Sequence, residues 1–200
     1  MATQQERKTK TRLAIMKKAR RLFEKHGFNE TSLDQLITAA NVAKGTFYQH
    51  FNTKLEVLIA LEREAGRGRA KAALAEIAEG LPVIPIVEKY LESLAEWFEA
   101  REKIAEIVIL SSLSQPDDKF TCDPELSTRS FIHNALDAAQ KQGDIRMDAD
   151  AWELTALVLG FITVSILGWS RNPQPGKLRI AFKRSMKLFL EGAQNTRLQQ

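Results

Sequence analysis

The segment KGTFYQHF, residues 44–51, gathers side chains that are able to do chemistry. Three aromatic rings, a histidine, a lysine and a glycine fall within eight residues. The segment is open to three interpretations: a piece of core, a metal or catalytic site, or a surface that meets another molecule. Lysine, hydroxyl and amide groups of this kind are the donors that proteins direct at DNA phosphates and base edges.

The sequence predicts neither a metal site nor a catalytic site. Its three histidines and one cysteine stand at positions 26, 50, 122 and 133, without metal-ligand spacing. There is no Gly-rich phosphate loop, nucleophile elbow or HExxH motif. We therefore expect no metal, no cofactor and no enzyme. Cys122 leaves two readings open, a redox switch or an incidental thiol, and no second cysteine is present to resolve an oxidised one.

The charge of the chain is unevenly distributed. Residues 1–55 contain 11 Lys or Arg against 4 Asp or Glu, whereas the remainder is slightly acidic and the whole chain carries +4. A basic front end on an acidic body is typical of a polyanion binder, although a solvated basic arm would show the same balance. The N-terminus is polar and basic, and it lacks the apolar segment of a secretory signal. With a single cysteine, this composition fits a reducing compartment, and we expect a cytoplasmic protein.

One long apolar run raises the question of a membrane. Residues 154–170 carry no charge, but these 17 residues fall short of the ~20 needed to span a bilayer and include threonine and serine. We expect a buried helix in a soluble protein and no membrane partner.

The elements around the opening segment read as short helices. Apolar residues at three- and four-residue steps predict a first helix over 10–26, which Gly27 ends because glycine adopts positive φ at little cost; the stripe is Leu13, Met16, Ala19, Leu22 and Phe23. Ser32 and Gln35 predict a capping box at the start of a second helix that stops near residue 40. A third helix over 44–51 and a fourth over about 54–79 follow, the fourth with weak points at Gly66 and Gly68.

Two short helices joined by a tight turn and packed on a first helix form a helix-turn-helix. The second of the pair is the candidate recognition helix, because the major groove admits one helix and its exposed N-terminal part reaches the bases. Glycine at 45 lets the backbone approach DNA, and the side chains placed for contact are Lys44, Thr46, Tyr48 and Gln49. His50 is able to bond a phosphate or to cap local backbone, and Lys54 is predicted to contact a phosphate, with a solvated lysine as the alternative.

Phe47 and Phe51 are four residues apart and share a helix face, so we predict that both fill the core of this small domain.

These residues resemble the TetR family of bacterial transcriptional regulators over residues 12–61. The markers are an A..LF...G first helix, a Thr/Ser pair before the second helix, and GTFY.HF..K..L at the recognition helix and after it. The resemblance implies that DNA, largely its backbone, contacts Ser32, Lys44, Thr46, Tyr48, His50 and Lys54. Three positions depart from the family pattern: Asn41 replaces a common glycine in the turn, Ala43 a frequent serine cap, and Ile37 a frequent alanine.

The remainder of the chain reads as five further helices, at about 84–100, 102–114, 124–142, 149–170 and 175–194. The predicted fold is all-α. An N-terminal three-helix DNA-binding domain, residues 9–68 with the start of a linking helix, joins a C-terminal helical domain, residues 69–200. The resemblance implies that this second domain binds an effector and forms a dimer.

The resemblance implies that the last two helices form a homodimer interface, and both carry stripes that suit this role. Small residues recur at four-residue steps in the first of them, at Ala156, Gly160, Val164 and Gly168. The last helix has a broad stripe, Leu178, Ala181, Phe182, Ser185, Leu188 and Phe189, although one chain could bury both stripes internally. A dimer would place two recognition helices about one DNA turn apart, near 34 Å or a multiple, on a palindromic operator.

Aromatic residues and one histidine of the second domain are candidates to line an effector pocket, with ordinary core packing as the alternative for each: Trp97, Phe98, Phe120, Phe131, His133, Trp152, Phe161 and Trp169. The mechanism we expect is a population shift, in which a small molecule favours a dimer that cannot bind DNA. The resulting prediction is a ligand-responsive repressor. The alternatives are a non-specific structural DNA-binding protein and an activator without an effector.

Overall fold

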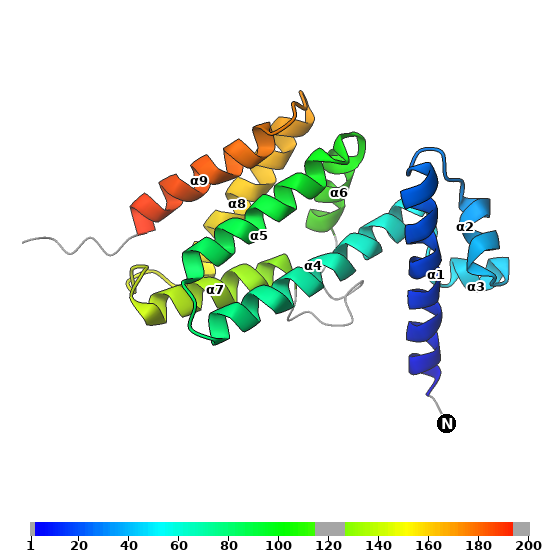
Figure 1. Cartoon of the computed structure of the whole chain (residues 1–200), viewed down its shortest axis with the longest axis horizontal. Helices are drawn as coiled ribbons and strands as arrows, with labels where there is room; N and C mark the ends of the chain where they lie inside the picture. Colours follow the sequence, from blue (N-terminus) through cyan, green and yellow to red (C-terminus); the bar gives the residue numbers. More distant parts are fainter. Residues whose placement is uncertain (1–2, 115–126, 194–200) are drawn as a thin grey trace, which may run out of the picture. The chain divides into compact units, whose positions relative to one another are not determined.

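The computed structural model describes residues 3–114 and 127–193, and within these residues the chain is helical (Figure 1). It divides into two compact units, Met1–Ala65 and Gly66–Gln200. The helices are α1 (Gln4–His26), α2 (Leu33–Ala40), α3 (Lys44–Tyr48), α4 (Lys54–Ala78), α5 (Val83–Glu99), α6 (Glu102–Ser114), α7 (Thr128–Gln142), α8 (Ala151–Ser170) and α9 (Lys177–Ala193). The all-α prediction is confirmed for the described part of the chain. Phe120 and Cys122 lie outside it.

The first unit is built around one small apolar core. Phe47 and Phe51 are fully buried there, as their spacing predicted, among residues from α1, α2 and the start of α4. One member of the predicted α1 stripe, at its N-terminal end, is wrong. Leu13 is 45% exposed, whereas Ile15 is 1% exposed and packs in the core with Met16 and Ala19. Both registers fit a helical period, and packing against Phe47 and Phe51 selects Ile15.

Local capping signals set the helix ends of this unit. The Ser32 hydroxyl accepts the backbone N–H of Gln35 and the Gln35 side chain accepts that of Ser32, which confirms the capping box. Gly27 ends α1 with φ +79°. An unpredicted capping box between Thr3 and Glu6 starts α1 at Gln4, well before the expected start at residue 10.

The fourth helix runs without interruption through Gly66 and Gly68, from Lys54 to Ala78. The predicted weak points are therefore not breaks. Each glycine costs about 1 kcal/mol in a helix, and the alanine, lysine, arginine and leucine residues around them have high helix propensity.

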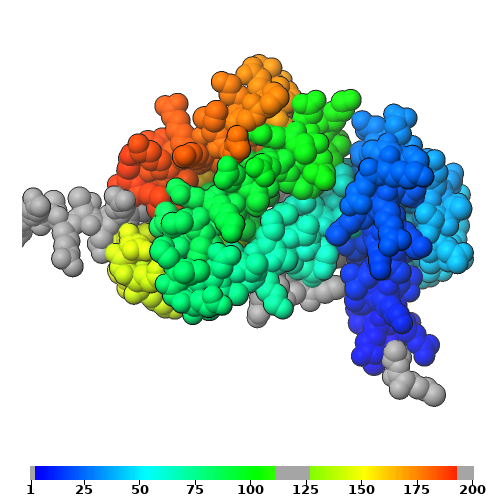
Figure 2. All heavy atoms as spheres, viewed as in Figure 1, coloured from blue at the N-terminus to red at the C-terminus, as the bar shows by residue number. Residues whose placement is uncertain are grey.

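The second unit consists of α5–α9 with the end of α4. Helix α5 packs against α6, α7 and α9, and α8 packs against α6, α7 and α9. Figure 2 shows α5 and α9 side by side at its surface. Most helix ends agree with the prediction. Helix α7, however, begins at Thr128 and not near residue 124, because Ser127 caps its N-terminus.

Helix α8 buries one face only. Val158, Ile162 and Ile166 are buried, whereas Leu157 and Val164 are 62% and 70% exposed. By length and apolar composition α8 could also cross a membrane, a test that a helix from a protein interior passes as well. The expectation of a buried helix thus holds for one side of α8, and the other side presents apolar residues at the surface of the single chain.

Polar side chains tie the loops of this unit to its helices. The Glu99 carboxylate, at the end of α5, accepts the backbone N–H groups of Gly176, Leu178 and Arg179 at 3.0, 2.8 and 3.1 Å. The buried amide of Gln140 donates to the carbonyls of Arg146 and Ala149, both at 2.8 Å. These contacts fix the starts of α9 and α8.

Candidate nucleic-acid interface

Helices α2 and α3 are joined by the short turn of residues 41–43. Asn41 adopts the left-handed conformation, φ +53° and ψ +46°, and its N–H donates to the Thr38 carbonyl. Asparagine tolerates this conformation better than most residues, so the turn forms without the family's usual glycine. Ala43 provides no side-chain cap for α3, as its residue type predicted. The pair is a helix-turn-helix on a first helix.

Most of the side chains predicted to meet DNA lie on α3 or directly after it, next to two buried rings: Phe47 within α3 and Phe51 after it. Lys44, Gly45 and Gln49 are exposed, Tyr48 is 41% exposed, and Thr46 is half-buried. A Cβ added at Gly45 would meet no atom within 4 Å, so nothing inside the protein requires glycine there. The close approach of DNA to Gly45 stays a prediction.

Two of these side chains have partners at the surface. The Lys44 ammonium lies 3.6 Å from the Asp34 carboxylate of α2, and both side chains are largely exposed. The Tyr48 ring stands edge-on to Phe47, with centroids 6.2 Å apart, and the residue stays partly exposed. An exposed ion pair contributes little energy, so this pair costs little to break.

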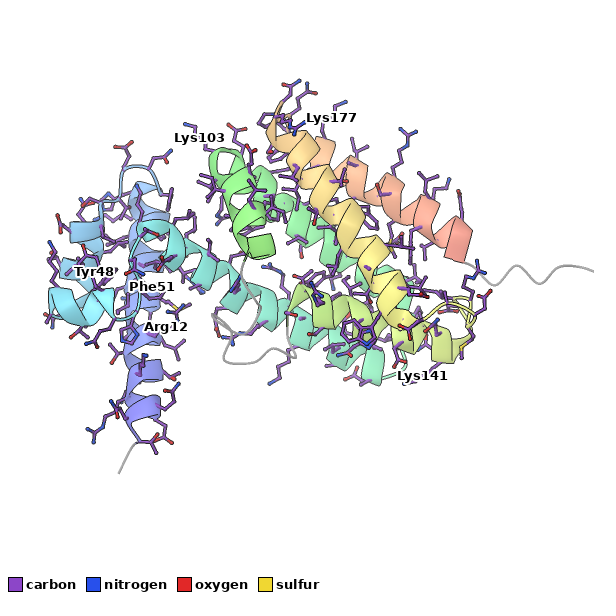
Figure 3. The ribbon with its side chains drawn as sticks, turned by 180° about the vertical axis from the view of Figure 1, so that it is seen from behind. Arg12, Tyr48, Phe51, Lys103, Lys141 and Lys177 are labelled. Atoms are coloured by element: carbon purple, nitrogen blue, oxygen red, sulfur yellow. The ribbon has the colours of Figure 1, made fainter. Side chains whose placement is uncertain are left out.

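His50 occupies a basic environment at the end of the recognition segment. Partial burial lowers the pKa of its imidazole below the ordinary value of 6.5, and the positive charges of Arg12 and Lys8 lower it further. The Arg12 guanidinium donates to the His50 carbonyl at 2.9 Å and lies 4.1 Å from the centroid of the Phe51 ring (Figure 3). Sequence reasoning missed Arg12, because no local pattern shows that a residue of α1 will reach a carbonyl 38 positions away.

Ser32 and Lys54 differ from the others, because both are already engaged within the protein. Ser32 is exposed at the start of α2 with its hydroxyl in the capping box. Lys54 is half-buried, and its ammonium donates to the carbonyls of Phe28, Asn29 and Thr31 at 2.9, 3.1 and 3.0 Å. Its assignment as a phosphate contact stays a prediction, and the structure gives it an intramolecular role.

The candidate pocket residues separate into several local groups. His133 and Trp152 stack with ring centroids 3.7 Å apart, and Trp97 contacts Phe98 and the Arg101 guanidinium. Phe131 is fully buried against Tyr90, and Phe161 meets Phe182 at 6.4 Å.

The two tryptophans of α8 lie in different surroundings, one buried and one exposed. Trp169 is 8% exposed and its indole N–H donates to the Gln174 carbonyl, whereas Trp152 is 53% exposed. A helix rises 1.5 Å per residue, so the two lie about 25 Å apart and do not line one small pocket. Among the described residues, the pair with an open polar group is His133 with Trp152, because the buried His133 Nδ1 has no hydrogen-bond partner.

The chain matches known proteins over both units. The family model described as bacterial regulatory proteins, tetR family, matches residues 15–61. The HTH-type transcriptional regulator UidR of Escherichia coli (strain K12) is 26% identical over 158 residues, which cover 78% of this chain and 80% of that protein. The probable acrEF/envCD operon repressor of the same organism is 23% identical over 170 residues, covering 82% and 77%.

Solved structures share the fold. Thermus thermophilus FadR, described as a TetR-family transcriptional repressor in complex with lauroyl-CoA, aligns over 90% of this chain and 94% of its own with a TM-score of 0.70 and 24% identity. Bacillus subtilis FadR in complex with stearoyl-CoA aligns over 90% and 98% with a TM-score of 0.62 and 18% identity. At such identities the likeness shows the architecture of an N-terminal helix-turn-helix and a C-terminal helical domain.

Proposed function

Because this chain carries the DNA-binding domain of the TetR family of bacterial regulatory proteins, we propose that it is a repressor whose dimer binds a palindromic operator and leaves it when a small molecule binds. The protein acts in the cytoplasm, where its DNA is. The observation that carries the proposal is the contrast in burial between neighbouring residues of the segment 44–51. Phe47 and Phe51 are fully buried and anchor the segment, whereas Lys44, Tyr48 and Gln49 are exposed and Thr46 is half-buried.

The exposed residues of α3 have separate tasks in this proposal. Lys44 and Gln49 read base edges, where each good bidentate contact contributes about 1–3 kcal/mol of discrimination. Tyr48, His50 and Ser32 contact phosphates, with the Gly45 backbone close to the duplex. Thr46, half-buried, contacts the backbone from the edge of the helix.

The dimer is proposed to form through α8 and α9. Large apolar side chains stand exposed on both helices, notably Leu157, Val164, Ile180 and Leu188, at 60–70% exposure. Such residues scattered singly need no explanation, but a row beside the small residues Ala156, Gly160 and Gly168 suits close helix packing. The two-fold axis of such a dimer requires a palindromic operator.

The effector is proposed to bind in the second unit. Two proteins of this fold were solved with acyl-CoA molecules, lauroyl-CoA in one and stearoyl-CoA in the other. These two compounds are therefore suitable first probes for this chain. The stacked His133 and Trp152 are the side chains we propose to contact an effector, since His133 Nδ1 has no hydrogen-bond partner among the residues that the structure describes.

Selection of bound fragments from random DNA tests the central proposal. We expect a palindromic consensus, and at fixed salt an affinity for it roughly 10³-fold or more above that for random DNA. A non-specific structural DNA-binding protein would instead yield no consensus and similar affinity for every sequence, which would refute the proposal.

Paired variants test the assignment of residues. Gln49→Ala or Lys44→Ala should change the preferred bases within the consensus, because base contacts specify. Lys103→Ala, an exposed lysine of α6 in the other unit (Figure 3), is the matched control and should leave both consensus and affinity unchanged. If the consensus is unaltered in both the Gln49→Ala and the Lys44→Ala variant, these two residues do not contact the bases.

A further inference from the structure

We propose that Lys54 positions the helix-turn-helix for DNA and is not itself a phosphate contact. It does so by fixing the loop of residues 27–32, which connects α1 to α2. This inference rests on the proposed function and deepens it, since it concerns how the reading helices are held. It also replaces the phosphate role that its sequence position predicts for Lys54.

The ammonium of Lys54 has all of its donors in use. A lysine ammonium carries three protons, and three loop carbonyls accept from it at 2.9–3.1 Å: those of Phe28, Asn29 and Thr31. The same nitrogen lies 4.6 Å from the centroid of the Phe28 ring, where a cation is attracted by the ring face. A phosphate could bind this group only by displacing one of these contacts.

The loop that Lys54 holds is ordered by further contacts of its own. The Thr31 hydroxyl, on a residue only 1% exposed, donates to the Gly27 carbonyl at 2.7 Å. The Phe28 ring packs on Phe23 of α1 with centroids 5.5 Å apart. The Thr31 bond closes the loop on itself, the Phe28 ring holds the loop to α1, and Lys54 holds it to α4.

Both ends of this connection belong to rigid parts of the unit. Lys54 is the first residue of α4, whose start is capped by the Thr53 hydroxyl and whose Val57 is fully buried in the core. On the other side, Ser32 follows the loop directly as the N-cap of α2. Lys54 therefore sets where α2 begins relative to α4, and α2 with its turn sets where α3 is presented.

The loss of this connection should affect DNA sequences unequally. Specific binding requires α3 to enter the major groove in one orientation, whereas non-specific binding needs only positive charge near phosphates. A loosened loop should therefore lower the affinity for the operator and leave the affinity for random DNA unchanged. A lost phosphate contact lowers both about equally and reduces the salt dependence of binding.

The test measures operator and random-DNA affinity across a salt series for Lys54→Met and Lys54→Arg in the full-length protein. Lys54→Met should lower operator affinity by about tenfold, the equivalent of one or two hydrogen bonds. Random-DNA affinity and the salt slope should stay at wild-type values. Lys54→Arg should not rescue the operator affinity, because a planar guanidinium cannot direct three donors onto three converging carbonyls, although it binds phosphates well.

Two results would overturn the proposal. In the first, both affinities fall together, the log–log salt slope drops by about 0.9 for each lost phosphate contact, and Lys54→Arg restores binding. In the second, Lys54→Met lowers thermal stability while both DNA affinities of the folded protein stay unchanged, which would make Lys54 merely structural.

Two further variants calibrate these readings. Thr31→Val removes the loop's hydroxyl contact without a change of charge, and it should reproduce the direction of the Lys54→Met result. Lys44→Met removes an exposed lysine of α3 that the proposed function assigns to base edges, so it should change the preferred bases, which Lys54→Met should not do. Amide exchange of residues 28–36 in the free protein gives a reading without DNA, and faster exchange is expected in Lys54→Met.

The two levels of proposal fail in different ways. If the wild-type protein itself shows no preference among DNA sequences, the proposed function is wrong. Unchanged amide exchange in Lys54→Met, with a wild-type protein that does select an operator, refutes the role of Lys54 alone.

Discussion

Each unit of this protein uses one charged side chain at a helix end to fix the start of another helix, and the two charges are opposite. In the first unit the Lys54 ammonium donates to three carbonyls of the loop before α2. In the second the Glu99 carboxylate accepts three N–H groups at the start of α9. The charge of each side chain matches the backbone groups that it binds: a cation binds unpaired carbonyls, and a carboxylate binds unpaired N–H groups.

The two arrangements differ in how the neighbouring helix dipoles act on the charged side chain. The start of a helix presents free N–H groups and the positive end of the helix dipole, both of which favour a carboxylate such as Glu99. The Lys54 loop lies between the C-terminal end of α1, whose dipole favours a cation, and the N-terminal end of α2, whose dipole disfavours one, so the two dipoles oppose each other there. We therefore expect Glu99 to contribute more to stability, and Lys54 to matter more for the geometry of DNA binding.

Replacement of Glu99 should have the largest effect. Glu99→Ala leaves the N–H groups at the start of α9 without their acceptor, and it should lower the free energy of unfolding by about 3 kcal/mol. Urea denaturation measures this. Glu96→Ala, on the same helix, removes only an exposed 3.8 Å ion pair with Arg179 and should cost below about 1 kcal/mol. Equal losses in the two variants would contradict the assigned role of Glu99.

The corresponding replacement in the first unit should be smaller. Lys54→Met keeps the aliphatic chain, and water can reach part of the exposed loop, so we expect a loss of about 2 kcal/mol in unfolding free energy. Lys44→Met, which breaks the exposed 3.6 Å pair with Asp34, is the control and should cost about 0–1 kcal/mol. A Lys54→Met loss above that of Glu99→Ala would reverse the comparison.

The start of helix α3 has no side-chain hydrogen bond like those of Lys54 and Glu99, so it serves as the reference for the comparison. Ala43 occupies an extended conformation, φ −59° and ψ 144°, without a side-chain hydrogen bond to the helix. Ala43→Ser should raise the free energy of unfolding by about 1 kcal/mol through a new N-cap. Ala14→Ser, at an exposed position inside α1, should instead destabilise slightly, because serine is a poorer interior residue. No gain in urea midpoint for Ala43→Ser would show that α3 is already held by Phe47 and Phe51 alone.

The smallest expected effect comes from the basic surroundings of His50. Burial, with Arg12 and Lys8, holds the imidazole pKa below 6.5 in the folded state. Between the folded-state pKa of His50 and about 6.5, the unfolded chain therefore binds more protons than the folded protein. The free energy of unfolding is unaffected by His50 above about pH 6.5, and it declines as the pH falls through the folded pKa.

His50→Gln should remove this part of the pH dependence, measured by urea denaturation at a series of pH values between 5 and 7.5. Lys8→Gln removes one contributing charge from an exposed position and should reduce it in part. A stability that rises as the pH is lowered in this range, and that His50→Gln abolishes, would show the opposite sign and contradict the assignment.

Much of the fold was predictable, because its signals are local. The Ser32–Gln35 capping box, the Gly27 stop and the Asn41 turn each depend on residues within a few positions. Phe47 and Phe51 were predicted to be core because a four-residue step places them on one face. The candidate DNA-contact residues follow by exclusion, since they are the residues of the segment 44–51 that Phe47 and Phe51 do not bury, and their contacts with DNA stay predictions.

Other features could not be predicted. Leu13 and Ile15 fit the helical period of α1 about equally well, and only the shape of the neighbouring core decides between them. The candidate pocket residues share a chemical type, yet the helices distribute them into separate contacts, such as His133 on Trp152 and Trp169 on the Gln174 carbonyl.

The sequence by itself determined the all-α class, the position of the helix-turn-helix and the two faces of KGTFYQHF, because helical periodicity and caps act over a few residues. Only the tertiary structure decided what the charged residues at helix ends do. Lys54 reaches carbonyls 23–26 residues away, and Glu99 reaches N–H groups 77–80 residues away. A lysine or glutamate in sequence shows its charge, whereas its partner is chosen by the packing that brings distant unpaired backbone groups within hydrogen-bond distance.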